Sequence, residues 1–571
     1  MKERESLPVD VWVYLVAFAL ALFIRFVGLG RLPLGNVEAS WALQAFSLIH
    51  PNVAHLGAQP AYTLFTSAMF FLFGTSETVA RLLPAMVGAL IVFVPVLFRH
   101  QIGREAAWFA ALGLAFEPGL VAASRTAGSP IISAVFLALA LGFILNRKPA
   151  WAGICAGLAM LGGAQFLPTT ISVLLLVGWE ALAKRKVAAI PGVEGPLPVN
   201  FWNQMGMWLA GTLLVAGTLF FTTPSGLSAF AASIAAYFLG WKDPQSVSIG
   251  HMLVVLVISS PLALLFGIWG AVRSIFGRDA LDGFFARLWL ISLVLVVVYP
   301  GRQPQDLIWT LIPLWGLAGR QIGRLIPLNR TEALPALLQM ILMVVLLFFG
   351  LMNLAAITLP DQASETMLLR LAALIGALVL MGLLAALVAW GWSPVSAGRG
   401  LIGGVAVFLL VLTLANTWRA AGLGTHPEAE LWRVDALPGE ADLLQNTLTD
   451  LSKWKTGQAN SLDVFVAGDA PASLRWMLRG YSQVEFGTEV PTDATPAIVF
   501  TSDQITLALN KPYRGQDFVL EINPVFANLD VRGDLLYLIY RVVPLQKSAT
   551  ILWARADIFP GQVPDVGVKN P

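Results

Sequence analysis

The sequence predicts a polytopic α-helical membrane protein with about 13 transmembrane helices, followed by a small C-terminal α/β soluble domain. Two observations predict this class. Hydrophobic residues make up 57% of the chain and charged residues only 12%, about half the share of charge in soluble proteins. The apolar residues also occur in blocks of about 20, the length that crosses a bilayer. Such blocks exclude a large soluble core.

The predicted spans fill a transmembrane domain over residues 1–420, and an extracytoplasmic α/β domain over 425–571 follows. The first span lies behind a short polar N-terminus and has no small-residue cleavage site after it, so we interpret it as an uncleaved helix. The spans are expected at approximately 11–29, 79–98, 106–123, 130–146, 150–165, 167–183, 205–222, 250–272, 285–299, 306–319, 334–358, 367–391 and 400–418.

The basic residues set the expected orientation. With the N-terminus in the cytoplasm, Lys and Arg fall on the inner side about four times as often as in the short outer loops, as the positive-inside rule requires. An odd number of helices then places the C-terminal domain outside. The predicted location is the plasma membrane, with the N-terminus cytoplasmic and the C-terminal domain extracytoplasmic.

The first outer loop, residues 30–78, is long and carries two apolar stretches that are too short or too interrupted to span. They cover 39–49 and 61–73 and are expected as helices in the membrane interface, with Trp41 and Tyr62 as amphipathic anchors. Simple channels and carriers rarely contain such helices, whereas an enzyme that acts on a lipid head group needs a platform of this kind.

Beyond residue 425 charges return and short apolar runs alternate with turn residues. This pattern predicts a helix at 472–481 and strands at 463–467, 497–501, 535–541 and 550–556. Gly468 and Gly480 are isolated and form no G-x-G-x-x-G motif, so no nucleotide site is predicted.

Polar residues of the outer segments are the candidates for chemistry. Glu38, at the start of the first interfacial stretch, is the candidate general base; alternatively, it is a solvated acid at a helix start. Arg302 lies in a tight outer loop, where its guanidinium suits a phosphate. The alternative for Arg302 is an interfacial anchor or a partner for Asp306.

Further candidates come from other outer segments. Arg125 and Glu117 lie about two helical turns apart and are candidates for substrate binding or for a buried structural pair. Trp241 is a candidate for stacking on a sugar, with Lys242 beside it, although interfacial anchoring is commoner for such a Trp. Asn36 belongs to the same outer group.

Metal binding is weakly supported. His50 and His55 of the first outer loop have no His, Cys, Asp or Glu partner at metal-ligand spacing, so no dedicated zinc site is predicted. A divalent cation stays open as a cofactor, although one carboxylate without an obvious second ligand makes a poor site for it.

The chain resembles the GT-C superfamily of membrane glycosyltransferases, in particular the branch of protein mannosyltransferases and aminoarabinose transferases. The matching stretches are 22–30, 33–45 with Glu38-Ala39, 70–74, 77–84 and 117–125, in the same order along the chain. The C-terminal domain, through 474–476 and 479–481, is similar to the tails of flippase-associated prokaryotic members.

The resemblance implies a hexosyltransferase-type enzyme that uses a polyprenyl-phosphate-linked sugar donor. It implies an inverting transfer to an extracytoplasmic acceptor, with a carboxylate of the first outer loop activating the acceptor and cationic groups holding the lipid phosphate. The acceptor (protein, lipid or polysaccharide) stays open, and no nucleic acid partner is expected. Arg302, Arg125, Glu117, Asn36, Trp241 and Lys242 are the predicted substrate-binding residues, and Glu38 the catalytic one.

The sequence departs from the family in one position that concerns mechanism. Family members usually carry an Asp-Glu pair in the first outer loop, where this chain has Val37-Glu38. Valine transfers no proton. The alternative function is therefore a catalytically degenerate GT-C scaffold that binds glycolipid or assists a flippase. A transporter is a lesser alternative, because it would require ionisable residues near the bilayer midplane and the predicted spans place few residues of this kind there.

Overall fold

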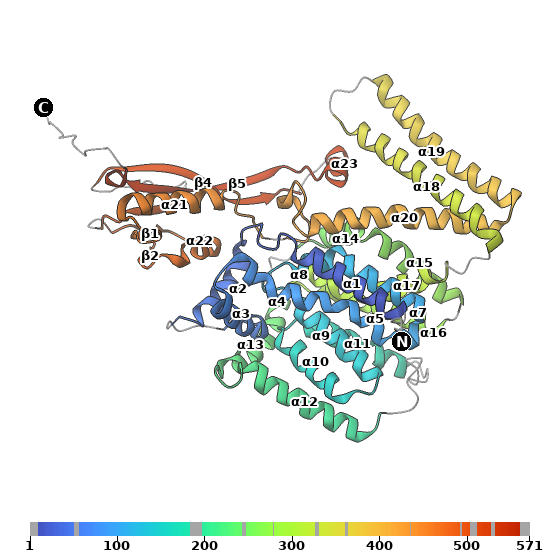
Figure 1. Cartoon of the computed structure of the whole chain (residues 1–571), viewed down its shortest axis with the longest axis horizontal. Coiled ribbons are helices and arrows are strands. Elements are labelled where there is room, and N and C mark those ends of the chain that lie inside the picture. The colour runs from blue at the N-terminus through green and yellow to red at the C-terminus, as the bar shows by residue number, and fades with distance from the viewer. Residues whose placement is uncertain are drawn as a thin grey trace, which may run out of the picture.

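The computed structural model describes residues 9–559 apart from 51–55, 183–196, 243–246, 278, 326–329, 360–363, 434, 492–493, 503–510 and 527–530. A helical bundle forms most of the molecule, and a sheet with its helices lies against one end of it (Figure 1). Helices α18 and α19 project from the bundle as a hairpin, and the long hairpin β4–β5 lies across the molecule above the N-terminal helices (Figure 1).

The N-terminal half consists of helices joined by short connections. They are α1 (Val9–Phe26), α2 (Asn36–Ser47), α3 (Pro60–Phe73), α4 (Glu77–Ala89), η1 (Leu90–Phe93), α5 (Val94–Leu97), α6 (Arg99–Ile102), α7 (Arg104–Phe116), α8 (Pro118–Ser124), α9 (Ile131–Leu145), α10 (Pro149–Leu161), α11 (Phe166–Leu182), α12 (Val199–Gly217), α13 (Ser225–Leu239) and η2 (Gly240–Lys242). The two predicted interfacial stretches are thus helices α2 and α3.

The later helices of the bundle are α14 (Ile249–Ser259), α15 (Pro261–Gly277), α16 (Ala280–Val298), η3 (Pro304–Leu307), α17 (Ile308–Gly323), α18 (Arg330–Ile357), α19 (Ser364–Gly391) and α20 (Pro394–Ala420). In α18 and α19 only 11% of the most apolar window is buried inside the protein. Long apolar helices with so little internal packing are typical of a lipid-facing position. The chain is a multi-pass membrane protein.

Fewer helices are long and apolar enough to cross a membrane than the sequence predicts. Among the described residues six helices are long and apolar enough to cross a membrane, or up to eight if each bent pair counts as one span. The count of 13 is therefore not confirmed, although each predicted span coincides with helix. Two predicted straight spans are bent: α7 and α8 meet at 51°, and α14 and α15 at 98°. Each bend precedes a proline, Pro118 and Pro261, whose ring cannot continue a helical hydrogen-bond ladder.

A five-stranded sheet with the order β2-β1-β3-β5-β4 organises the C-terminal region. Strands β1 (Val464–Ala467), β2 (Val484–Gly487) and β3 (Ile498–Ser502) are parallel, whereas β4 (Tyr513–Pro524) and β5 (Leu545–Arg555) add an antiparallel hairpin. The other elements are η4 (Pro427–Ala429), α21 (Ala441–Thr456), α22 (Ala472–Met477), η5 (Leu478–Gly480), α23 (Val531–Tyr540) and η6 (Ala556–Ile558). One core of its own, with Leu444, Leu474 and Phe500 fully buried, lies on the sheet.

Most of the predicted C-terminal elements are confirmed, but the strand predicted at 535–541 is wrong. This segment belongs to helix α23. Its apolar and aromatic residues suit a strand by composition alone. The helical form buries Tyr537, whose hydroxyl donates to the Ala429 carbonyl at 3.1 Å and whose ring packs edge-on against Phe526. Tertiary packing therefore overrides the local preference. Helix α21 and strands β2 and β4 were not predicted.

The C-terminal region is docked on the first-loop helices. Trp476 of α22 is buried against α2, α3 and α4, with its ring 5.8 Å from that of Phe70. Its indole nitrogen donates to the Glu77 carboxylate at 2.9 Å, and Arg479 donates to the Thr75 carbonyl at 3.2 Å. These contacts fix the sheet over the start of α2 and α4.

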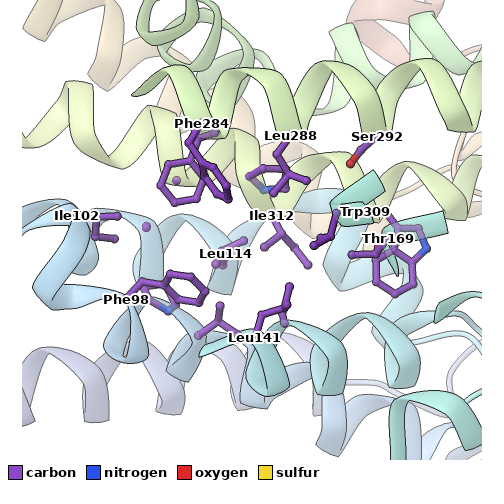
Figure 2. A pocket seen from close by; sticks show the side chains of 18 of the residues that line it. Phe98, Ile102, Leu114, Leu141, Thr169, Phe284, Leu288, Ser292, Trp309 and Ile312 are labelled. Carbon is purple, nitrogen blue, oxygen red and sulfur yellow. The ribbon is translucent and has the colours of Figure 1, made fainter. Parts of the chain in front are cut away.

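An apolar cavity of about 160 Å³ lies inside the bundle. Figure 2 shows side chains from several helices around it, among them Leu114, Leu288 and Ile312, with Thr169 and Ser292 as its hydroxyl groups. Among the described residues, no ionisable side chain lines it. The cavity suits an apolar ligand and offers no group for acid–base chemistry.

Candidate functional site

Glu38 lies in the first turn of α2, where it pairs with Arg81 of α4. The Arg81 Nε donates to Glu38 Oε1 at 2.8 Å and its Nη2 to Oε2 at 2.6 Å. Both side chains are buried, Arg81 being 2% exposed and Glu38 7%. Arg81 also donates to the carbonyls of Leu29, Leu32 and Pro33, so its five N–H groups are all used.

The surroundings of Glu38 hold it in the charged form. Burial alone would raise the pKa of this carboxyl, but the Arg81 guanidinium and the Ala127 amide, which donates to Oε1 at 2.9 Å, lower it overall. Each carboxylate oxygen thus accepts at least one hydrogen bond from a fixed donor. The role of Glu38 as general base stays a prediction, and the structure gives it a firm structural contact as well.

Two charged residues that sequence reasoning missed lie beside Glu38. Asp435, which follows the last long helix, accepts a hydrogen bond from the Val37 amide at 2.5 Å, across 398 positions of the sequence. It takes the place of a side-chain cap on α2, because Gly35 supplies none. The lack of a side chain at Gly35 also permits the approach, since a Cβ there would lie 2.5 Å from Asp435 Oδ2.

Arg433 is the second missed residue. It is partly buried and lies within electrostatic range of Glu38, Arg81, Glu430 and Asp435. Burial lowers the pKa of Arg433, and the three acids offset this only in part. No side-chain hydrogen bond or ion pair of its guanidinium occurs in the part of the chain that the structure describes. A partly desolvated cation without a contact acid favours an added anion.

Arg125 lies on the same side as this cluster but is committed to structure. Its Nη1 donates to the carbonyls of Ile24, Arg25 and Val27 at 2.8–3.0 Å, and its Nη2 to that of Gly28 at 3.0 Å. These carbonyls lie at the C-terminal end of α1, where acceptors lack helical partners. Arg125 therefore caps α1, and it adds positive charge close to Arg81 and Arg433.

Asn36 connects α2 to the C-terminal region. Its side-chain nitrogen donates to Glu521 Oε1 at 2.9 Å, and its side-chain oxygen accepts from the Ser473 amide at 3.1 Å. Both ends of the amide are therefore used within the protein. The Glu38 cluster, which we define as Glu38, Arg81, Arg125, Arg433 and Asp435, lies under this contact.

Arg302, Trp241 and Lys242 form a separate group. Arg302 donates to the carbonyls of Val247, Val297 and Tyr299 at 2.7–3.2 Å. Trp241 packs edge-on against the Tyr299 ring at 5.5 Å and is 40% exposed, and Lys242 beside it is exposed. Among the described residues, the hydrogen bonds of Arg302 and the ring contact of Trp241 reach no residue of the Glu38 cluster. Arg302 also does not pair with Asp306, which instead accepts from the Gln303 amide at 2.8 Å.

Glu117 lies inside the bundle, at the bend between α7 and α8. It accepts hydrogen bonds from the Ser260 hydroxyl, at the bend between α14 and α15, and from the Trp315 indole at 2.6 Å. The expected alternative of a Glu117–Arg125 pair is not formed. Glu117 joins the two bent helix pairs and belongs to neither group of candidate binding residues.

No group of three or more His, Cys, Asp or Glu side chains that suits a metal ion occurs in the described ranges. The Glu38 cluster offers two carboxylates with three arginines around them. Arginines repel a cation, so this donor set suits an anion better than a divalent metal.

No family model matches the chain, and no curated protein sequence matches it. Solved structures do. ArnT from Cupriavidus metallidurans, bound to undecaprenyl phosphate, matches with a TM-score of 0.55 at 14% identity, over 97% of this chain and 100% of that one. The same protein in the apo state matches with a TM-score of 0.57 at 16% identity, over the same shares of the two chains.

The Archaeoglobus fulgidus oligosaccharyltransferase in the apo form matches less well. Its TM-score is 0.42 at 14% identity, over 83% of this chain and 64% of that one. The identities are low throughout, so the likeness concerns the fold. In its fold, over nearly its whole length, the chain is similar to ArnT, so the fold that the sequence resemblance to GT-C membrane glycosyltransferases implies is confirmed.

Proposed function

We propose that the protein is a membrane glycosyltransferase that moves a sugar from a polyprenyl-phosphate-linked donor to an extracytoplasmic acceptor. The observation that carries this proposal is the Glu38 cluster. Two carboxylates lie beside Arg433, whose guanidinium has no contact acid in the described part of the chain. Acids that take up a proton and a cation that takes up a phosphate are the two groups that this transfer requires.

The fold supports the class of donor. ArnT, whose fold this chain shares, has been solved with undecaprenyl phosphate bound. Arg433 is positioned to hold the phosphate of such a lipid, and the apolar cavity inside the bundle suits part of its chain (Figure 2). Arg302, the phosphate ligand predicted from the sequence, is the alternative for the phosphate contact.

The chemistry of the transfer follows from these groups. A carboxylate of the cluster takes the proton of the acceptor hydroxyl as the hydroxyl oxygen attacks the anomeric carbon. The bond between that carbon and the phosphate oxygen breaks, and its electron pair stays on the phosphate beside Arg433. Attack opposite to the leaving group inverts the anomeric configuration. Placement of the C-terminal domain outside the cytoplasm, where lipid-linked sugars replace nucleotide sugars, is part of the proposal.

Donor consumption tests the proposal. The full-length protein in lipid nanodiscs is incubated with a panel of undecaprenyl-phosphate-linked sugars and an envelope extract as the source of acceptor, and released undecaprenyl phosphate is quantified. We expect release above the protein-free control with at least one sugar. Absence of release with every sugar contradicts a transferase.

One observation favours the scaffold alternative. Both oxygens of Glu38 are occupied by Arg81 and Ala127, as expected for a purely structural acid, and the adjacent position is Val37. Saturable donor binding without consumption in the same assay identifies a glycolipid-binding scaffold.

A further inference from the structure

The two carboxylates at the start of α2 have different surroundings. Glu38 accepts two hydrogen bonds from one guanidinium and a third from the Ala127 amide. Asp435 accepts a hydrogen bond from the Val37 amide, and the backbone amides of Asn36 and Glu38 also point to it, but no arginine donates to it within the described chain. Glu38 is buried, whereas Asp435 is partly exposed. Of the two, Asp435 is the acid that a hydroxyl group can reach.

We propose that Asp435, held at the start of α2 by the Val37 amide, is the general base of the transfer, and that Glu38 is a positioning residue that acts through Arg81. This inference rests on the proposed function. It places the base on the segment after the last long helix, whereas the sequence suggests the first outer loop. The carboxylate lies directly beside the backbone of Val37, the position at which the chain has no acid of its own.

The proton affinities of the two acids support this assignment. The pKa of Asp435 is raised to about 6 in total, mainly by burial and in part by the nearby charge of Glu38, while the amides of Val37, Asn36 and Glu38 oppose the rise. The pKa of Glu38, in contrast, is lowered, so the two acids differ in proton affinity. Neighbouring acids whose proton affinities are driven apart are typical of acid–base sites. A base with a pKa near the working pH transfers protons best.

The charged groups that face Asp435 come from several elements. Glu38 lies on α2 and its partner Arg81 on α4. Arg433 lies on the same segment as Asp435. Glu521 of β4 bonds to Asn36, one residue before Val37. Asp435 thus has the acid Glu38 and the cation Arg433 within electrostatic range, and the departing phosphate would bind on the Arg433 side.

The proton balance of the step is complete. The acceptor hydroxyl gives its proton to a carboxylate oxygen of Asp435, and its oxygen forms the new bond to the anomeric carbon. The phosphate leaves with the electron pair of the broken bond. Asp435 then releases the proton to water, which is accessible because the side chain is partly exposed.

Asp435→Asn tests the proposal against a purely structural role. The asparagine side-chain oxygen still accepts the Val37 amide, so the helix cap survives, but the residue no longer takes up a proton. We expect turnover of the undecaprenyl-phosphate-linked sugar to fall by at least about 100-fold, the lower range for general-base catalysis. Binding of undecaprenyl phosphate should change by less than threefold.

Glu521→Gln is the matched control, because it also replaces a nearby carboxylate by an amide that keeps an acceptor for Asn36. This variant should retain wild-type turnover. The wild-type rate should also rise with pH through about 6, and the residual rate of Asp435→Asn should lack this rise.

Three results would overturn the inference. Turnover of Asp435→Asn within tenfold of the wild type excludes Asp435 as the general base. A loss of undecaprenyl phosphate binding as large as the loss of turnover also excludes it. An unchanged pH profile in the variant excludes it too. A wild-type protein that consumes no donor removes the proposed function first, so the two failures are distinguishable.

Discussion

Two of the buried carboxylates, Glu38 at the outer loop and Glu117 inside the bundle, have opposite surroundings. Glu38 is bound by a guanidinium that is itself surrounded by carbonyls, with two further arginines and Asp435 nearby. Glu117 is bound by a hydroxyl and an indole, with no charged donor among the described residues.

The difference separates a charged site from a structural joint. A cluster of several charges in a low dielectric is retained at a cost, and such clusters occur where charge is needed. Neutral donors around a single acid connect two bent helix pairs without bringing in charge. This contrast supports the proposal that the Glu38 cluster carries the chemistry. Glu117 joins the bends, and its substrate-binding role stays a prediction.

Removal of the Glu38 charge should have the largest effect on stability. Glu38→Gln leaves the Arg81 guanidinium buried without a counter-charge, which typically costs about 3–5 kcal/mol. Thermal unfolding of the detergent-solubilised protein measures this. Arg104→Gln is the control, because it removes the ion pair with Asp10, which is of similar length but has an arginine side chain that is 58% exposed. An exposed ion pair contributes less than about 1 kcal/mol. Equal shifts in the two variants would contradict a buried, fully used pair.

Asp435→Asn should change how stability depends on pH. A carboxyl whose folded pKa is raised from 3.8 to about 6 binds its proton more tightly when folded. Its stabilising effect is complete below about pH 4 and is lost as the pH rises through 6. The loss is about 2–3 kcal/mol, from about 1.4 kcal/mol per pKa unit. Melting temperatures of the wild type, measured from pH 4 to 8, should fall relative to the variant.

The same series of melting temperatures can also contradict this prediction. If the difference between the wild type and Asp435→Asn is constant from pH 4 to 8, Asp435 titrates like an ordinary aspartate and the burial argument fails.

Glu117→Gln should have a smaller effect. The glutamine oxygen still accepts one of the two hydrogen bonds, and no buried cation loses its partner, so about 1–2 kcal/mol is expected from one unmatched polar group. Thermal unfolding beside Glu38→Gln measures the difference. A destabilisation by Glu117→Gln that equals that of Glu38→Gln would remove the distinction between the two regions.

Much of the architecture was predictable because it is local. Apolar blocks predict the helices of the bundle, and the two interrupted stretches of the first outer loop predict α2 and α3. The bends at Glu117 and Ser260 were signalled by Pro118 and Pro261. Helix α23 was not, because its aromatic residues favour a strand locally and only contacts such as Tyr537 to Ala429 decide the outcome.

The site was predictable only in part. Glu38 was named as a candidate from its place in the first outer loop, but its partner Arg81, which also donates to the carbonyls of Leu29 and Leu32, was not among the candidates. Asp435 and Arg433 were missed because nothing in their local sequence marks them. Their importance arises from a contact across 398 positions. The charge that returns directly after the last apolar helix was the one available signal.

The phosphate contact tests the central claim most directly. Binding of undecaprenyl phosphate to the wild type, Arg433→Gln and Arg302→Gln is compared in nanodiscs. We expect at least about tenfold weaker binding for Arg433→Gln, since a charged hydrogen bond contributes about 1.5–3 kcal/mol, and a change of less than threefold for Arg302→Gln. Unchanged binding in Arg433→Gln together with weaker binding in Arg302→Gln would contradict the proposed contact of Arg433 with the phosphate. The lipid phosphate would then be assigned to the Arg302 group.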